Sequence, residues 1–154
     1  MTNPVILTFV AHYLPGYKSG GPVRTIANMV AHLGINLDFH IITADRDSFE
    51  DHPYSNIMVN KWNQAGLAKV FYASPDFLRF RNIVKLICDT PHDVLYLNSF
   101  FTPKFTIMPL LARRLWLIQH RPVVLAPRGE FAKDALGLEA WKKRPYLTIA
   151  RWLS

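Results

Sequence analysis

The chain has 154 residues, half of them apolar, which is enough to bury one sizeable core and falls within the usual range of a single domain. Its formal charge is +7, of which residues 113–154 supply +6 through nine basic and three acidic groups, while residues 1–112 hold nine basic and eight acidic groups. A basic surface favours phosphate-rich partners, which include nucleic acid, an anionic membrane face, and nucleotide or lipid diphosphates. We expect neither a signal peptide nor a membrane span, and we interpret the protein as cytoplasmic, because the N-terminus has no basic segment and the apolar runs are short or interrupted by arginine.

The first 43 residues predict one βαβ unit. Residues 5–10 form a short apolar run typical of a strand buried on both faces. Residues 22–33 have apolar side chains at helical spacing, with Pro22 suited to the first turn and Gly34 placed to end the helix. Residues 39–43 read as a second buried strand, which favours a parallel sheet with a right-handed crossover.

The remaining elements continue the alternation. Residues 57–62 and 68–72 are two β-prone runs separated by NQAGL, which suggests a hairpin or a strand beside a small edge element. Helices are expected over 76–88 and 104–117, and strands over 93–100 and 122–127. The pattern predicts an α/β, Rossmann-like, three-layer domain with four or five mostly parallel strands.

Cysteine and histidine give no sign of a disulfide or a metal site. The single cysteine, Cys88, lies among apolar neighbours and is interpreted as a small buried hydrophobic residue. The six histidines match no metal-ligand spacing, so no bound metal is expected.

In open parallel sheets, ligands bind beyond the carboxyl ends of the strands, so the loops that begin at His12, Asp45, Asn98 and Arg128 are the candidates. Ser19-Gly20-Gly21 opens the first helix, where glycines allow a diphosphate or a sugar hydroxyl to approach backbone N–H groups. The alternative is a tight turn in which Ser19 or Gly21 only caps the helix. The segment matches neither GxGxxG nor GxxxxGK[ST].

Four more residues near these strand ends are candidates. Arg24 lies one turn into the first helix and is either a crevice contact or a solvated arginine. Asn98 and Ser99 end a buried strand, where polar groups bind sugar hydroxyls or simply terminate the strand. His12 directly follows the first strand, as a base, a hydroxyl contact or an ordinary loop residue.

Arg128, Gly129 and Lys133 follow the last strand, where arginine can pair with phosphate and glycine gives it room. A surface pair of Arg128 with Glu130 or Asp134 is the alternative. Residues 141–152 mix basic and aromatic side chains, a composition of membrane-surface helices, of nucleic-acid patches and of ordinary solvated helices.

Four segments together resemble the N-terminal domain of family 4 glycosyltransferases, which have the two-domain GT-B architecture. They are HYLPGYKSGGPVRTIANMVAHL, WNQAGLAKVFY, DVLYLNSFF and LAPRGEFAKDALGLEAWKKRPYL. The double glycine before the first helix and the APRGE segment before a lysine-rich stretch are the most specific parts. The resemblance implies that residues 1–154 are the acceptor-side half of such an enzyme, facing a donor-binding half across a cleft.

The resemblance also implies roles and substrates. Gly20 and Gly21 would approach the donor diphosphate or the transferred sugar, and Arg128 would help neutralise the leaving nucleotide diphosphate. The donor would be a nucleotide-sugar, without a further cofactor or metal, and the acceptor a glycan or a lipid-linked sugar in polysaccharide biosynthesis. The donor motif Glu-x7-Glu of the family is absent, so we expect a truncated half with little or no activity alone.

Two other functions remain open. The chain is alternatively a non-catalytic acceptor-binding subunit of a two-chain transferase, which predicts a tight, stoichiometric partner. Nucleic-acid binding through the basic end would fall steeply with salt and ranks below the others, because no nucleic-acid fold motif is present. A peripheral association of residues 141–152 with the inner membrane face is also expected on the basic, aromatic composition of that segment.

Overall fold

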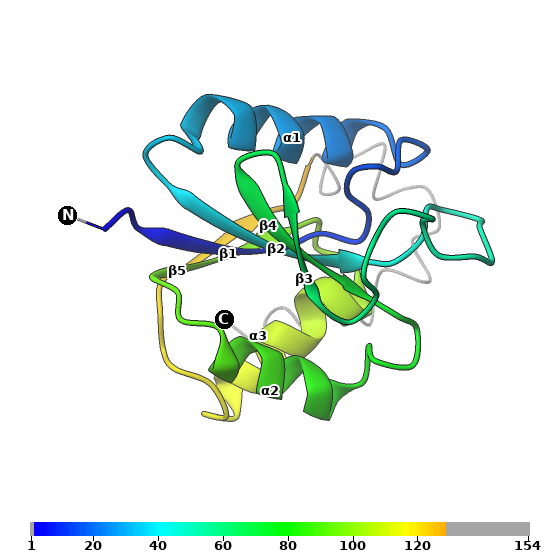
Figure 1. Ribbon diagram of the computed structural model, residues 1–154. Coiled ribbons are helices and arrows are strands. Elements are labelled where there is room, and N and C mark those ends of the chain that lie inside the picture. The colour runs from blue at the N-terminus through cyan, green and yellow to red at the C-terminus, as the bar shows by residue number, and fades with distance from the viewer. Residues whose placement is uncertain (1, 129–154) are drawn as a thin grey trace.

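The computed structural model describes residues 2–128, which form a mostly parallel six-stranded sheet between two layers of helices (Figure 1). The helix α1 covers one face, and α2 and α3 cover the other. The elements are β1 (Val5–Phe9), α1 (Gly21–Leu33), β2 (Asp38–Ala44), β3 (Trp62–Ala65), β4 (Ala68–Ala73), α2 (Phe80–Asp89), β5 (Val94–Asn98), the π-helical turn η1 (Pro103–Ile107), α3 (Met108–Arg114) and β6 (Val123–Ala126). The expected α/β class and mostly parallel sheet are confirmed, and the arrangement is compatible with a Rossmann-like fold.

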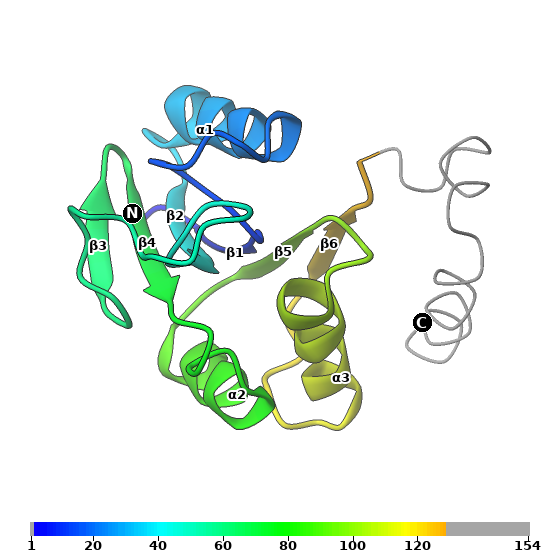
Figure 2. The ribbon, with the colours of Figure 1, turned by 90° about the vertical axis from the view of Figure 1, so that its right-hand side faces the viewer.

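The strand order is β3-β4-β2-β1-β5-β6, and only the β3–β4 pair is antiparallel. The chain runs from β1 outward to β2 and β4, then crosses back to β5 on the other side of β1. Figure 2 shows β3 and β4 at one edge of the sheet and β6 at the other. The direction of travel therefore reverses between β1 and β5, which makes their carboxyl ends the expected place for a ligand.

Alternation along the strands divides the core between the two faces. Leu7 and Phe9 of β1 pack with α2 and α3, in a cluster that also holds Leu95 and Leu97 of β5. On the opposite face, Ile26 and Val30 of α1 pack over the residues of β2 and β4 that point toward it. Because side chains alternate along a strand, β1 contributes to both clusters, through Leu7 and Phe9 to the first and through Ile6 to the second.

Three expected elements differ from those observed. Residues 57–61 form turns rather than a strand, and β3 begins at Trp62 and runs through most of NQAGL to the hairpin turn at Gly66, whose φ is 59°. Residues 75–77 form a turn in which Phe77 N–H donates to Ser74 O, so α2 begins only at Phe80. The stretch expected as one helix over 104–117 is η1 followed by α3, which ends at Arg114.

Cys88 is exposed, which corrects its interpretation as a buried residue. The buried face of α2 consists of Ile83, Leu86 and Ile87, and Cys88 lies one position beyond that face. Its thiol donates to the Leu117 carbonyl at 3.4 Å. Within residues 2–128, no helix is long and apolar enough to cross a membrane.

Candidate functional site

A cleft of about 160 Å³ lies at the carboxyl ends of β1 and β5. The residues that line it are Val10, Ala11, His12, Ser19, Pro22, Asn98, Ser99 and Thr102. They come from the loop after β1, the start of α1 and the loop after β5, so the cleft occupies the point where the strand order reverses. The structure thus brings together His12, Asn98 and Ser99, which the sequence analysis selected from separate segments. We call this the switch-point cleft.

Gly20 and Gly21 lie where α1 begins beside the switch-point cleft. Gly20 has φ 59° and ψ −113°, a conformation that side-chain-bearing residues rarely adopt, and Gly21 opens the helix. A Cβ atom added to either residue would meet no heavy atom of residues 2–128 within 4 Å. The described part of the chain therefore leaves both backbones accessible, as a close approach to the helix N-terminus requires.

Gly20 is itself the N-cap of α1, and its N–H donates to Tyr17 O at 3.1 Å, so part of the expected tight turn is present. No side chain caps the helix, so neither Ser19 nor Gly21 has the expected capping role. The Ser19 hydroxyl lies 2.7 Å from the Ser48 hydroxyl instead. This contact joins the glycine segment to the loop after β2.

Asp47 anchors the same segment and was not selected from the sequence. Its carboxylate accepts hydrogen bonds from the backbone N–H groups of Tyr17 at 2.8 Å, Lys18 at 3.1 Å and Ser48 at 2.8 Å. Burial raises the pKa of Asp47, but the three backbone N–H donors outweigh it and leave the pKa below its usual value. A charged carboxylate thus fixes the approach to Gly20 from the neighbouring loop.

Arg128 lies at the rim of the switch-point cleft, because it contacts the lining residue Asn98 but is not itself among the lining residues. Its Nε donates to Asn98 Oδ1 at 2.6 Å, and Nη2 donates to the Tyr96 hydroxyl at 2.9 Å. A guanidinium has five N–H donors, so three remain for a ligand. The exposed Arg128 side chain is thereby positioned by β5. Glu130 and Asp134, its alternative partners, lie outside the described residues.

Two residues at this rim have backbone conformations that are unusual for non-glycine residues. Ser99 has φ 74° and Arg128 has φ 53°. Ser99 is held by its N–H bond to Ala126 O at 2.9 Å and by the Thr106 hydroxyl, which donates to Ser99 O at 2.6 Å. Such conformations persist where the surroundings determine them, and they cluster at binding sites.

His12 and Arg24 have different relations to the cleft. His12 lines it, and Nδ1 lies 3.1 Å from the carbonyl oxygen of Arg46. Because a carbonyl oxygen only accepts, this contact is a hydrogen bond when Nδ1 carries the ring proton, and Nε2 of the neutral ring is then an acceptor. Arg24 is exposed on α1 and does not line the cleft.

Some predicted features lie outside the described residues. They are Gly129, Lys133 and the basic segment 141–152. Across the described part of the chain, no group of three or more His, Cys, Asp or Glu side chains is arranged to hold a metal ion.

Sequence reasoning missed Asp47 and Tyr96 as supports of the site. Asp47 lies in the loop after Asp45, which was a candidate by position, but a carboxylate that binds a distant backbone leaves no local pattern. Tyr96 accepts a hydrogen bond from Arg128, which is 32 positions away in the sequence. Only the pairing of β5 with β6, in which Asn98 lies beside Ala126, brings these residues together.

Comparison with protein-family models, with curated proteins and with solved structures gave no match to this chain.

Proposed function

We propose that this chain is the acceptor-side half of a GT-B glycosyltransferase similar to family 4, and that its switch-point cleft faces the diphosphate and transferred sugar of a nucleotide-sugar. The observation that carries the proposal is the convergence of an open glycine backbone, a helix N-terminus and Arg128 around one cleft. The acceptor is a glycan or a lipid-linked sugar.

The cleft provides groups suited to the negative charge that develops on a departing nucleotide diphosphate. Open backbone at Gly20 and Gly21 lets a phosphate approach the positive end of the α1 dipole. The three remaining N–H donors of Arg128 can form a paired contact with phosphate oxygens. Donors that are already in place stabilise such charge without reorganisation.

His12 is the residue of the cleft with proton-transfer chemistry. Because it follows β1 and lines the same space as Ser99, it is placed to contact an acceptor hydroxyl. The donor half would come from a further domain or from a second chain. We accordingly expect little or no sugar transfer by this chain alone.

Residues 141–152 would add a peripheral contact with an anionic inner membrane face. Lys142, Lys143, Arg144 and Arg151 supply charge, and Trp141 and Trp152 supply interfacial aromatic groups. Such a contact would bring a lipid-linked acceptor to the enzyme.

The proposal is tested by calorimetric titration of the full chain with uridine and guanosine diphosphates. Arg128→Gln should weaken the binding of at least one of them about tenfold or more, because a charge-assisted hydrogen bond is lost. Arg121→Gln is the matched control, since Arg121 is an exposed arginine that precedes β6, at the opposite end of the strand from Arg128. If neither diphosphate binds, or if both variants lose affinity equally, the cleft does not have the proposed role.

A further inference from the structure

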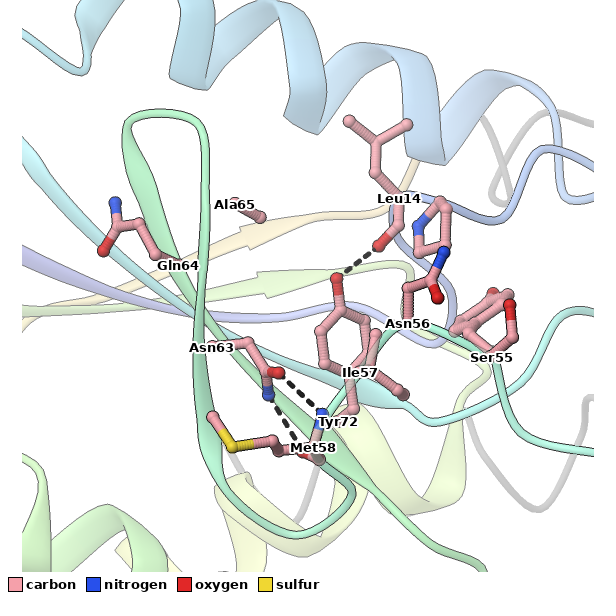
Figure 3. A pocket seen from close by; sticks show the side chains of 11 residues that line it. Leu14, Ser55, Asn56, Ile57, Met58, Asn63, Gln64, Ala65 and Tyr72 are labelled. Carbon is pink, nitrogen blue, oxygen red and sulfur yellow. Dashed lines mark hydrogen bonds between the residues drawn. The ribbon is translucent and has the colours of Figure 1, made fainter.

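A second and larger cavity, of about 490 Å³, lies on the α1 side of the sheet near its antiparallel edge (Figure 3). It is formed by the loop after β1, the loop after β2 and the β3–β4 hairpin. Its lining residues are Leu14, Pro15, Tyr54, Ser55, Asn56, Ile57, Met58, Asn63, Gln64, Ala65 and Tyr72. We call it the hairpin pocket, and its volume is within the range of small-molecule sites.

The lining of the hairpin pocket is uncharged. Among the described residues that form it, none is an aspartate, glutamate, lysine, arginine or histidine. The composition instead combines apolar groups, such as Leu14, Ile57 and Met58, with hydroxyl and amide groups. The lining of the switch-point cleft also has no aspartate, glutamate, lysine or arginine, but it includes His12, and its residue Asn98 accepts a hydrogen bond from the guanidinium of Arg128.

The walls of the hairpin pocket are fixed by internal hydrogen bonds. The Asn63 amide accepts from Met58 N–H at 2.7 Å and donates to Met58 O at 2.9 Å, which holds the turn of residues 58–61 against β3. The Tyr72 hydroxyl donates to Leu14 O at 2.6 Å and ties the loop after β1 to β4. A cavity with such supports is formed before a ligand arrives.

Ser55 and Asn56 supply polar groups that the fold does not use. Both side chains are exposed, and neither forms a hydrogen bond with another described residue. Asn56 offers two donors and one acceptor, and Ser55 one hydroxyl. Together with the apolar wall, these groups suit a ligand that has apolar ring surfaces and several hydroxyls but no charge.

We propose that the hairpin pocket binds an uncharged sugar ring. This inference rests on the proposed function, in which the sugar ring belongs to the acceptor. The loop between β1 and α1 supplies Leu14 and Pro15 to the hairpin pocket and His12 and Ser19 to the switch-point cleft. One short loop therefore borders both the neutral site and the diphosphate site.

The test is an NMR titration of the full chain with the methyl glycosides of glucose, galactose, mannose and N-acetylglucosamine. At least one should shift the amide resonances of Ser55, Asn56 and Ile57 in a saturable manner. Methyl glucuronide tests the exclusion of charge, and cyclohexanol tests whether an apolar ring suffices. Both should bind more weakly than the best neutral glycoside.

Two variants make the assignment specific. Asn56→Ala should weaken glycoside binding about three- to tenfold, the usual effect of one neutral hydrogen bond, without changing the fold. Asn36→Ala removes an exposed amide from the turn between α1 and β2, which does not line the hairpin pocket, and should bind as the wild type does. The inference is overturned if no neutral glycoside shifts these resonances, if cyclohexanol or the glucuronide binds as well, or if the two variants behave alike.

This outcome is distinguishable from that of the proposed function. Glycoside binding without any diphosphate binding would retain the neutral site and remove the transferase proposal. Diphosphate binding without glycoside binding would retain the transferase proposal and remove the neutral sugar site.

Discussion

At the scale of single residues, Gly20 combines an unusual backbone conformation with a backbone that no described residue covers. Its φ of 59° with ψ of −113° requires glycine, whereas Gly21 is in the first turn of α1. Among the described residues, no atom lies close enough for an added methyl group to clash at either position. The two glycines therefore differ in strain but not in the room around them.

Gly20→Ala should lower the free energy of unfolding by about 1–2 kcal/mol, because alanine is strained at this φ. Gly21→Ala should change it by less than about 0.5 kcal/mol, as for an exposed position without special features. Urea denaturation of both variants measures the difference. Equal stability of the two variants would contradict the assigned role of Gly20.

His40 on β2 is a second residue of interest, because its surroundings lower the pKa of its imidazole. Its ring lies 5.4 Å from that of Trp62, its Nε2 is 3.7 Å from the Asp38 carboxylate, and neither ring nitrogen has a hydrogen-bond partner among the described residues. Burial lowers its pKa, and the charges of Lys69 and His92 act in the same direction, while Asp38 opposes them.

The protein should therefore lose stability as pH falls below about 6.5, the usual pKa of histidine. In this window the unfolded chain binds a proton at His40 that the folded chain resists, so acid favours unfolding until the pH reaches the lowered pKa. Thermal unfolding between pH 7.5 and 5.5 should show a smaller pH dependence in His40→Gln than in the wild type. An unchanged pH dependence in this variant, or the same reduction in the exposed-site control His32→Gln, would be inconsistent with this assignment.

At the scale of elements, the loops after β1 and β2 form one unit through Asp47. Three backbone N–H groups depend on its carboxylate, two of them in the segment that leads to Gly20. Gly16 fits closely beneath the same loop, since an added Cβ would lie 3.1 Å from Asp47 Cγ and 2.2 Å from the Tyr54 hydroxyl. The position of the glycine segment thus depends on a residue about 30 positions away.

Asp47→Ala should reduce the free energy of unfolding by about 1–2 kcal/mol, because three part-buried hydrogen bonds from backbone N–H groups lose their charged acceptor. It should also weaken diphosphate binding, since the approach to Gly20 would lose its support. Asp76→Ala is the control, because the Asp76 side chain is almost fully exposed and its ion pair with Arg79, at 3.7 Å, is exposed as well. A stability change no larger than that of the control would rule out the anchoring role.

The sequence predicted the elements whose burial follows a regular period and failed where side chains bind the backbone. The strands β1, β2, β5 and β6 and the helix α1 were located to within a few residues, because continuous apolar runs and a 3.6-residue period mark them. Residues 57–61 are β-prone, but the Asn63 amide binds the backbone at both Met58 and Lys61 and closes a turn. The interpretation of Cys88 failed because its apolar neighbours in sequence lie on another side of α2.

At the scale of the whole molecule, strand order determines which loops meet. Position after a strand was enough to select His12, Asn98, Ser99 and Arg128, because parallel strands end at the same edge of the sheet. The hairpin pocket could not be predicted in this way, because an antiparallel hairpin and two loops form it without a shared motif. The loop between β1 and α1 thus borders both the switch-point cleft and the hairpin pocket, which under the proposed function would receive two different substrates.

The most direct test of the central claim is an NMR map of the full chain as inorganic pyrophosphate is added. The account predicts saturable shifts centred on Gly20, Gly21, Ser99 and Arg128, which weaken as salt is raised because the contact is electrostatic. The resonances of Asn36 and Arg121, at the other ends of their strands, should not move. Shifts that avoid the switch-point cleft, or that spread evenly over exposed lysines and arginines, would contradict the claim that this cleft receives the diphosphate of a sugar donor.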